Sequence, residues 1–150
     1  MTTLSAALTG VGRLALDTAP LIYLVEGHSS FGPLVRAVIE RAERGELQLV
    51  SSVLTLTEVL TLPFERGATD LAREYKSLLL HTPYLRLEPI GPQVAERAAA
   101  LRARHRLKTP DAIQLAVAME AGCAAFLTND FALRRVDFPA VIVLSELQVE

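Results

Sequence analysis

The chain contains few cysteines, histidines and aromatic residues. Among 150 residues there are one cysteine, three histidines and 5% aromatic residues. The single cysteine, Cys123, excludes an internal disulfide framework, and His28, His81 and His105 do not have the spacing of zinc ligands. Any metal ion bound by this protein would therefore have oxygen ligands.

The chain also lacks an excess of positive charge and a long hydrophobic run. The formal net charge of −2 gives no broad electropositive field, so nucleic-acid binding would require a local basic patch. No basic N-terminal region precedes an apolar run, and no uncharged stretch has the composition of a membrane span, so we expect a cytoplasmic protein. The composition, 51% hydrophobic and 21% charged, is ordinary for one globular domain with a substantial core.

Short apolar segments alternate along the chain with segments of helical periodicity. Strands are expected at 13–16, 47–50, 85–87, 124–127 and 141–144, and helices at 20–25, 33–44, from Ser51 or Ser52 to near Pro63, 70–80, 92–105 and after Thr109. This alternation predicts an α/β fold in which a parallel sheet is covered by helices on both faces. We expect a single domain over 1–150, with residues 1–12 as a loose leader.

The helix that starts at Thr109 has unusually clear signals. Thr109 is suited to cap the helix, Pro110 to occupy its first position, and Asp111 falls in the first turn, where the helix dipole favours a carboxylate. No charge follows until Glu120, which indicates a buried helix. Gln114 lies on the same helix face as Asp111, and it either reaches a substrate or is a satisfied polar group near a helix end.

Four carboxylates stand alone in apolar segments, without a local basic partner: Asp17, Glu58, Asp111 and Asp130. Taken singly, each has an explanation as a helix cap or turn residue, except that Glu58 lies inside an apolar helix. Unpaired buried carboxylates are costly, so the four together favour a shared cation, and their oxygen ligands suit Mg²⁺ or Mn²⁺. Because Asp17 and Asp130 follow strands, a common site at the carboxyl end of the sheet is expected.

Four segments carry a resemblance to a known family. They are LDTAPLIY from Leu16 to Tyr23, TEVL from Thr57 to Leu60, TPDAIQLA from Thr109 to Ala116, and LTND from Leu127 to Asp130. In their order and intervals they resemble the four acidic motifs of the PIN-domain family. The chain length and the TPDA segment are most similar to VapC-type toxin ribonucleases of toxin–antitoxin pairs.

The resemblance implies a PIN-like three-layer α/β/α fold with a parallel five-stranded sheet in the order 3-2-1-4-5. It implies an Mg²⁺- or Mn²⁺-dependent endoribonuclease in which Asp17, Glu58, Asp111 and Asp130 are the catalytic, metal-binding acids and Thr128 contacts metal-bound water or phosphate. The expected partners are RNA, a cognate small antitoxin and a second copy of the chain in a homodimer. The residues before the first strand depart from the usual start of the family.

A basic run leads into Asp111 and consists of Arg97, Arg102, Arg104, His105, Arg106 and Lys108. Contacts from Arg104, Arg106 and Lys108 to phosphate would position RNA without reading its sequence, and Arg134 and Arg135 would extend the patch. The alternative is a solvated helix face.

Two other functions are compatible with part of this pattern. A phosphatase of the haloacid dehalogenase type also places an aspartate after its first strand, but it requires a second aspartate two residues later, where this chain has Ala19. The stronger alternative is a non-catalytic PIN-like binding module that acts through protein or RNA interaction. The presence of all four acids argues against such a loss of activity.

Overall fold

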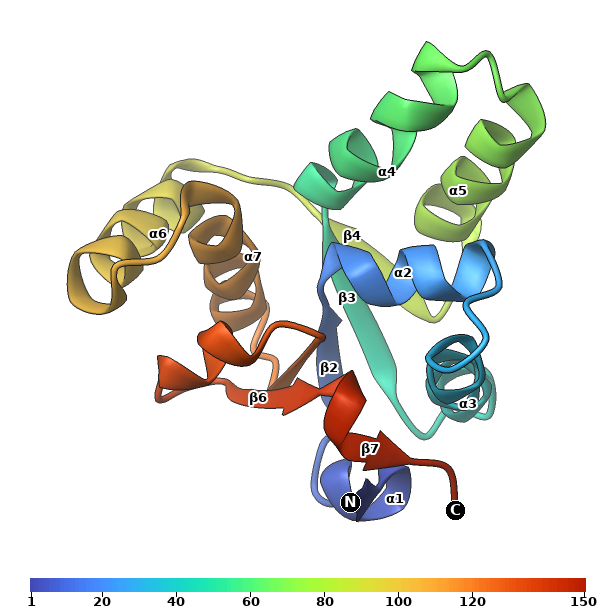
Figure 1. Ribbon diagram of the computed structural model, residues 1–150. Coiled ribbons are helices and arrows are strands. Elements are labelled where there is room, and N and C mark those ends of the chain that lie inside the picture. The colour runs from blue at the N-terminus through green and yellow to red at the C-terminus, as the bar shows by residue number, and fades with distance from the viewer.

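The central element of the fold is a five-stranded parallel sheet, seen in a computed structural model that describes all residues 1–150 (Figure 1). Its strands are β2 (Arg13–Leu16), β3 (Gln48–Ser52), β4 (Leu85–Glu88), β5 (Ala125–Thr128) and β6 (Ala140–Val143). They lie in the order β4-β3-β2-β5-β6, and all four pairings are parallel. Counted along the chain within this sheet, this is the predicted order 3-2-1-4-5.

Successive side chains of a strand point to opposite faces of the sheet, and the central strands have apolar residues at successive positions. Both faces of the sheet are therefore apolar. On β2, Leu14 and Leu16 belong to one hydrophobic cluster and Ala15 to the other. On β5, Leu127 lies in the first cluster and Phe126 in the second. The sheet therefore has two cores, and each core requires a layer of helices to exclude water.

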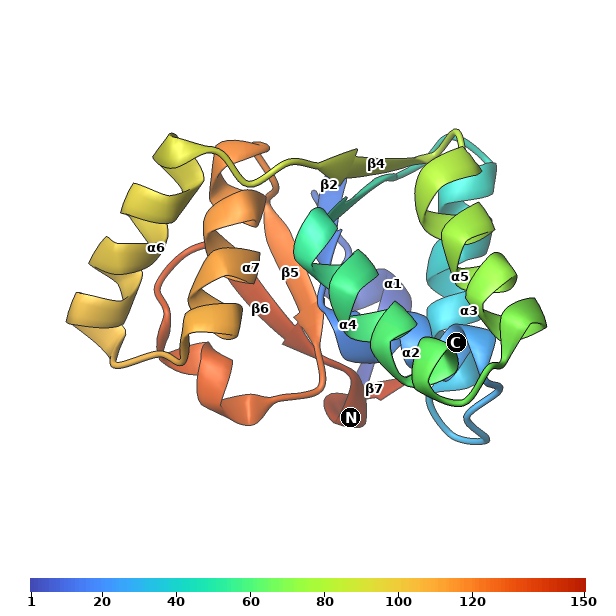
Figure 2. The ribbon, with the colours of Figure 1, turned by 90° about the horizontal axis from the view of Figure 1, so that it is seen from above.

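The helices form those two layers (Figure 2). On the side of the larger cluster lie α2 (Thr18–Val25), α3 (Gly32–Glu43), α4 (Val53–Glu65) and α5 (Thr69–His81), and on the other side lie α6 (Pro92–His105) and α7 (Thr109–Glu120). Helix α7 packs between α6 and the sheet and contributes Leu115, which is fully buried. Two short 3-10 helices, η1 (Phe131–Arg135) and η2 (Leu144–Glu146), follow β5 and β6. None of the helices is long and apolar enough to span a membrane.

Several predicted helix ends are displaced by one or two residues. Helix α4 continues through Pro63 to Glu65; the proline removes one backbone hydrogen bond, and its ring is buried. Lys108, rather than Thr109, occupies the N-cap position of α7. Ser52 precedes α4 as its N-cap but makes no capping bond, since its hydroxyl donates to Gln114 instead.

The expectation of a loose leader at 1–12 is wrong. Strand β1 (Thr2–Thr3) pairs in parallel with β7 (Leu147–Gln148), and α1 (Leu4–Ala7) follows it directly. Leu4 and Leu8 are buried in the larger core cluster. The two termini lie side by side (Figure 1), and the Ser5 N–H donates to Glu150 Oε1 at 2.8 Å. The N-terminal segment is held by packing against a partner strand 145 residues away.

We expect Leu4→Ala to lower the free energy of unfolding by about 2–5 kcal/mol, the usual cost of removing a buried leucine side chain. Leu4 is only 2% exposed, whereas Leu80, on α5, is 48% exposed and provides a matched control. Urea unfolding followed by circular dichroism measures both variants. If Leu4→Ala costs no more than Leu80→Ala, the N-terminal segment does not belong to the core.

Candidate functional site

The four predicted acids lie at the carboxyl end of the sheet, on four different elements. Asp17 directly follows β2, Asp130 lies two residues after β5, Asp111 is in the first turn of α7, and Glu58 is in the first half of α4. Their charges act on one another: Asp111 and Glu58 raise the pKa of Asp17, and Asp130 and Glu58 raise that of Asp111. The structure thus brings together the acids that the sequence separates.

Asp17 is the most constrained of the four. It is half-buried and serves as the N-cap of α2, with Oδ1 accepting from the Thr18 N–H at 2.8 Å. Oδ2 accepts from the hydroxyl of Thr128 at 2.7 Å. Burial raises the pKa of Asp17, and the charges of Asp111 and Glu58 add to this, while the two hydrogen bonds oppose it. The folded protein therefore pays a desolvation cost to keep a charge here.

Asp111 is half-buried and lies near both acidic and basic groups. Burial is the largest cause of its raised pKa, followed by the charge of Asp130. Lys108 and Arg135 lower the pKa of Asp111, so these two cations lie within electrostatic reach of the acids. A carboxylate flanked in this way is typical of a functional site.

Glu58 and Asp130 are exposed, so only Asp17 and Asp111 bear the cost of a partly buried carboxylate. The segment around Glu58 packs through Val59 and Leu60, which turns Glu58 toward solvent, because an apolar sequence does not fix which face of a helix is covered. Glu58 Oε1 accepts from the Thr18 hydroxyl at 2.6 Å, and Asp130 Oδ1 accepts from the Ala132 N–H at 2.9 Å.

The donor set fits a hard divalent cation by its chemistry. It consists of carboxylate oxygens, and none of the seven ion pairs in the structure involves any of the four acids. Their mutual repulsion is therefore relieved by no salt bridge to lysine or arginine. As the side chains lie, however, no group of three or more histidine, cysteine, aspartate or glutamate residues is arranged so that it could hold a metal ion.

A buried polar cluster beside the acids was not predicted. Ser52, Thr55 and Gln114 are buried, and together with Thr18 they form a chain of hydrogen bonds that ends at Glu58. The structure therefore favours the second reading of Gln114, a satisfied polar group. The spacing of three residues between Thr55 and Glu58 places both on one face of α4 and was the available signal.

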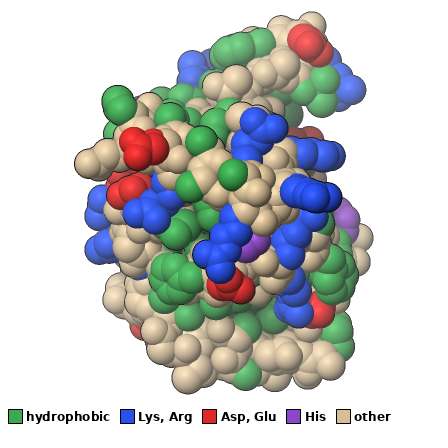
Figure 3. Space-filling model, turned by 90° about the vertical axis from the view of Figure 1, so that its left-hand side faces the viewer, with side chains coloured by type: hydrophobic (Ala, Val, Ile, Leu, Met, Phe, Trp, Pro, Cys, Tyr) green, Lys and Arg blue, Asp and Glu red, His purple; other side chains and the backbone are tan.

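The predicted substrate contacts differ in their surroundings. Thr128 is fully buried and its hydroxyl already bonds Asp17 and the Asp130 N–H, so it supports the acids and does not face a substrate. Arg104 is exposed and pairs with Asp137 at 3.2 Å. Arg106 and Lys108 are exposed and form no ion pair. Lysine and arginine side chains gather on the face of the molecule where α6 lies (Figure 3).

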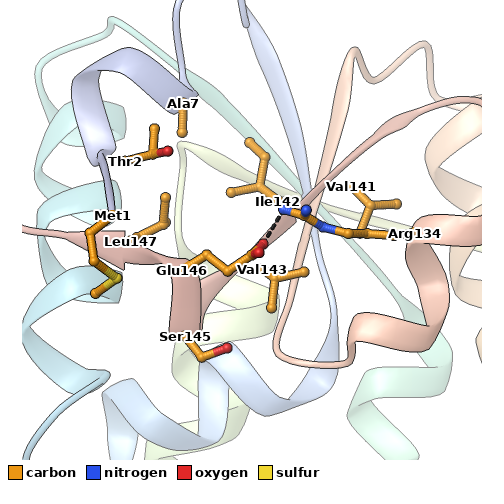
Figure 4. Close-up of a pocket in the computed structure, with 10 residues that line it drawn as sticks. All are labelled: Met1, Thr2, Ala7, Arg134, Val141, Ile142, Val143, Ser145, Glu146 and Leu147. Carbon is orange, nitrogen blue, oxygen red and sulfur yellow. Dashed lines mark ion pairs between the residues drawn. The ribbon is translucent and has the colours of Figure 1, made fainter.

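Arg134 forms no ion pair with any of the four acids. It forms an ion pair with Glu146 on the wall of a pocket of about 390 Å³ between the N-terminal segment and β6 (Figure 4). None of the four acids lines this pocket. Of the two arginines that follow Asp130, only Arg135 therefore extends the basic patch toward Asp111.

The sequence matches the family model described as PIN domain over residues 14–139. No curated protein matches the sequence significantly. Similar solved structures include a toxin–antitoxin complex from Klebsiella pneumoniae, with 24% identity, a TM-score of 0.68, and coverage of 87% of this chain and 97% of that chain. At 12% identity, VapBC2 from Rickettsia felis, bound to a promoter DNA fragment, has a TM-score of 0.66 with coverage of 87% and 98%.

A third similar structure is VapC20 from Mycobacterium tuberculosis, described as a toxin that cleaves the sarcin–ricin loop. It is 19% identical, has a TM-score of 0.60, and the match covers 75% of this chain and 86% of that chain. At these identities the three likenesses establish a shared fold.

We expect Thr128→Val to destabilise the metal-free protein by about 1–3 kcal/mol at pH 7.5, because Asp17 Oδ2 and the Asp130 N–H both lose a partner. The Thr128 hydrogen bond lowers the pKa of Asp17, so it favours the ionised form. The loss should therefore shrink as the pH falls toward 4 and Asp17 becomes protonated. Urea unfolding between pH 4 and pH 8 measures this dependence.

The exposed Thr61→Val is the matched control for this measurement and should change stability by less than about 0.5 kcal/mol at every pH. A Thr128→Val loss that stays constant across the pH range would show that the hydroxyl does not act on the charge of Asp17.

Proposed function

Because the chain belongs to the PIN domain family, we propose that it is a metal-dependent endoribonuclease and the toxin of a toxin–antitoxin pair. The observation that carries this proposal is that Asp17, Glu58, Asp111 and Asp130 lie at one edge of the sheet and that none of them forms an ion pair. Burial and, beyond it, the neighbouring carboxylates raise the pKa values of Asp17 and Asp111, which is a cost that a structural role alone does not require.

The four acids would hold Mg²⁺ or Mn²⁺. When bound, such an ion activates water for attack on a phosphodiester and neutralises charge at the leaving oxygen. The chain's own contribution is to hold the acids in place. Thr128 and the Thr18 N–H do so for Asp17, and the Thr18 hydroxyl does so for Glu58. Asp130 retains one carboxylate oxygen that accepts no hydrogen bond from the protein.

The RNA would lie across the basic side of the site. Lys108 and Arg135 are exposed and close enough to Asp111 to lower its pKa, and Arg106 is exposed just before Lys108. Contacts from these side chains to phosphate would place a strand against the acids without specifying its sequence. Arg104 is weakly held by its exposed pairing with Asp137 and is available for the same role.

The proposed protein partners are a small antitoxin and a second copy of the chain. The similar structure from Klebsiella pneumoniae is a toxin–antitoxin complex, which supports an antitoxin here. We expect the antitoxin to dock on the segment from Leu60 to Tyr75, where two large apolar side chains at the end of α4, Leu62 and Phe64, are 47% and 62% exposed. An apolar partner helix that covers this segment would remove them from water.

A non-catalytic binding module is the second candidate function. It is favoured by the absence of any set of three acids already arranged to hold a metal ion. Such a module would bind RNA or protein through the same surfaces but would not cleave RNA, so a cleavage assay separates the two functions.

We expect Asp111→Asn to reduce cleavage of a panel of structured RNAs in Mg²⁺ by about 100-fold or more, because the loss of a metal ligand should exceed the 10–100-fold cost typical of a ligand's supporting partner. EDTA should abolish cleavage by the parent protein. Asp70→Asn, at an exposed position in the first turn of α5, is the matched control and should cleave at the parent rate. Equal rates for Asp111→Asn and the parent would remove Asp111 from the site, and no cleavage by the parent on any RNA would favour the binding module.

We also expect divalent metal to stabilise the protein by mass action. Magnesium at 100 times its Kd would add about 2.7 kcal/mol, which raises the Tm of a domain of this size by roughly 5–10 °C. Differential scanning fluorimetry on protein stripped with EDTA measures the shift, and Asp70→Asn should show the same shift as the parent. If Mg²⁺ and Mn²⁺ both leave the Tm of the stripped parent unchanged, the acids do not form a metal site.

A further inference from the structure

Gln114 is the only buried side-chain amide, and it joins four elements of the fold beside the acids. It is 4% exposed on α7, and its partners are Ser52 at the end of β3, Thr55 and Glu58 on α4, and Thr18 at the start of α2. Burying an amide is unfavourable unless its hydrogen bonds are satisfied, and here both its oxygen and its nitrogen have partners.

The surroundings fix which way the amide points. The Ser52 hydroxyl is 2.7 Å from Gln114 Oε1, and Nε2 lies 2.8 Å from Thr55 Oγ1 and 3.5 Å from Glu58 Oε1. A rotated amide would place its oxygen against the Glu58 carboxylate, which can only accept when ionised. The amide nitrogen therefore faces the acids and the amide oxygen faces Ser52.

The hydroxyl protons then follow one direction. Thr18 has a single hydroxyl proton, and Glu58 Oε1, at 2.6 Å, is its closest acceptor. Thr55, 3.1 Å from Thr18 Oγ1, must then donate to Thr18, while it accepts from Gln114. The second proton of Nε2 faces Thr18 Oγ1 at 3.2 Å. The donors therefore point in one direction along the network, from Ser52 through Gln114, Thr55 and Thr18 to Glu58.

This hydrogen-bond network restrains the side chain of Glu58, which the packing of α4 does not. Glu58 is exposed and has a long, flexible side chain. Fixing that side chain each time the site forms would cost conformational entropy. The Thr18 hydroxyl holds Oε1, and Oε2 accepts no hydrogen bond from the protein. The Thr18 hydroxyl thus holds Oε1, while Oε2 remains available at the site shared with Asp17 and Asp111.

We propose that Gln114 is a positioning residue whose fixed amide, acting through the Thr18 hydroxyl, places the carboxylate of Glu58 at the candidate metal site. This inference rests on the proposed function for its effect on RNA cleavage, but the placement of Glu58 itself is measurable without metal or RNA.

The test compares Gln114→Met, which keeps the length of the side chain but cannot donate, with Thr18→Val, which removes the hydroxyl at the other end of the network. Ser51→Ala is the matched control: Ser51 is buried on β3 next to Ser52, and its hydroxyl has no hydrogen-bond partner. The first readout is the ¹³C resonance of the Glu58 carboxyl in metal-free protein at pH 7.5, assigned by its disappearance in Glu58→Gln. Gln114→Met and Thr18→Val should each move this resonance toward those of exposed glutamates, and Ser51→Ala should not.

The second readout is Mn²⁺ binding by calorimetry, where both variants should bind about 10-fold more weakly, the lower end of the usual effect of a ligand's supporting partner. In RNA cleavage, kcat should fall while KM for RNA changes less than about twofold. The double variant should lose no more affinity than either single variant, because both act on the same path.

An unmoved Glu58 resonance in both variants would overturn the proposal, and so would additive losses in the double variant. If Gln114→Met does not fold, Thr18→Val alone decides the resonance test. If the parent cleaves no RNA, the proposed function fails, and the resonance still decides whether Gln114 places Glu58.

Discussion

The half-buried carboxylate of Asp17 is the constraint around which the site is built. It lies at the end of the central strand, between β3 and β5, and burial there requires a hydrogen-bond donor for each oxygen. The Thr18 N–H supplies one and the Thr128 hydroxyl the other. Thr128 ends β5, so its hydroxyl reaches Asp17 only because β2 and β5 pair with Leu16 opposite Leu127. The register of β2 and β5 therefore determines whether the Asp17 carboxylate has its hydrogen-bond donor.

Two of the acids in the proposed site also have structural roles. Asp17 caps α2 and Asp130 caps η1, so the ordinary explanation of each residue is correct. A cap uses one carboxylate oxygen, however, and a carboxylate has further lone pairs to offer. The cap fixes the backbone at the end of a strand and so determines where the remaining oxygen lies. In this fold capping prepares the site that the family resemblance implies.

The site concentrates negative charge at one end of the sheet. The rest of the molecule has to offset the unfavourable free energy of placing these charges close together. Two core clusters, one on each face of the sheet, supply the favourable burial. The buried polar network behind Glu58 adds specificity, since all its members are satisfied and only one arrangement of its protons agrees with an ionised Glu58. A strained or costly feature beside a stable core is what a functional site typically shows.

The sequence by itself determined the order of strands and helices, the two apolar faces of the sheet, and the positions of Asp17 and Asp111 next to a strand end and a helix start. These follow from periodicity and cap chemistry, which are local properties of the chain. Only the tertiary structure decided that the N-terminal segment pairs with β7, that Glu58 faces solvent, and that Gln114 bonds three other elements. Each depends on contacts between residues far apart in sequence, and no local pattern encodes which distant side chain will satisfy a buried polar group.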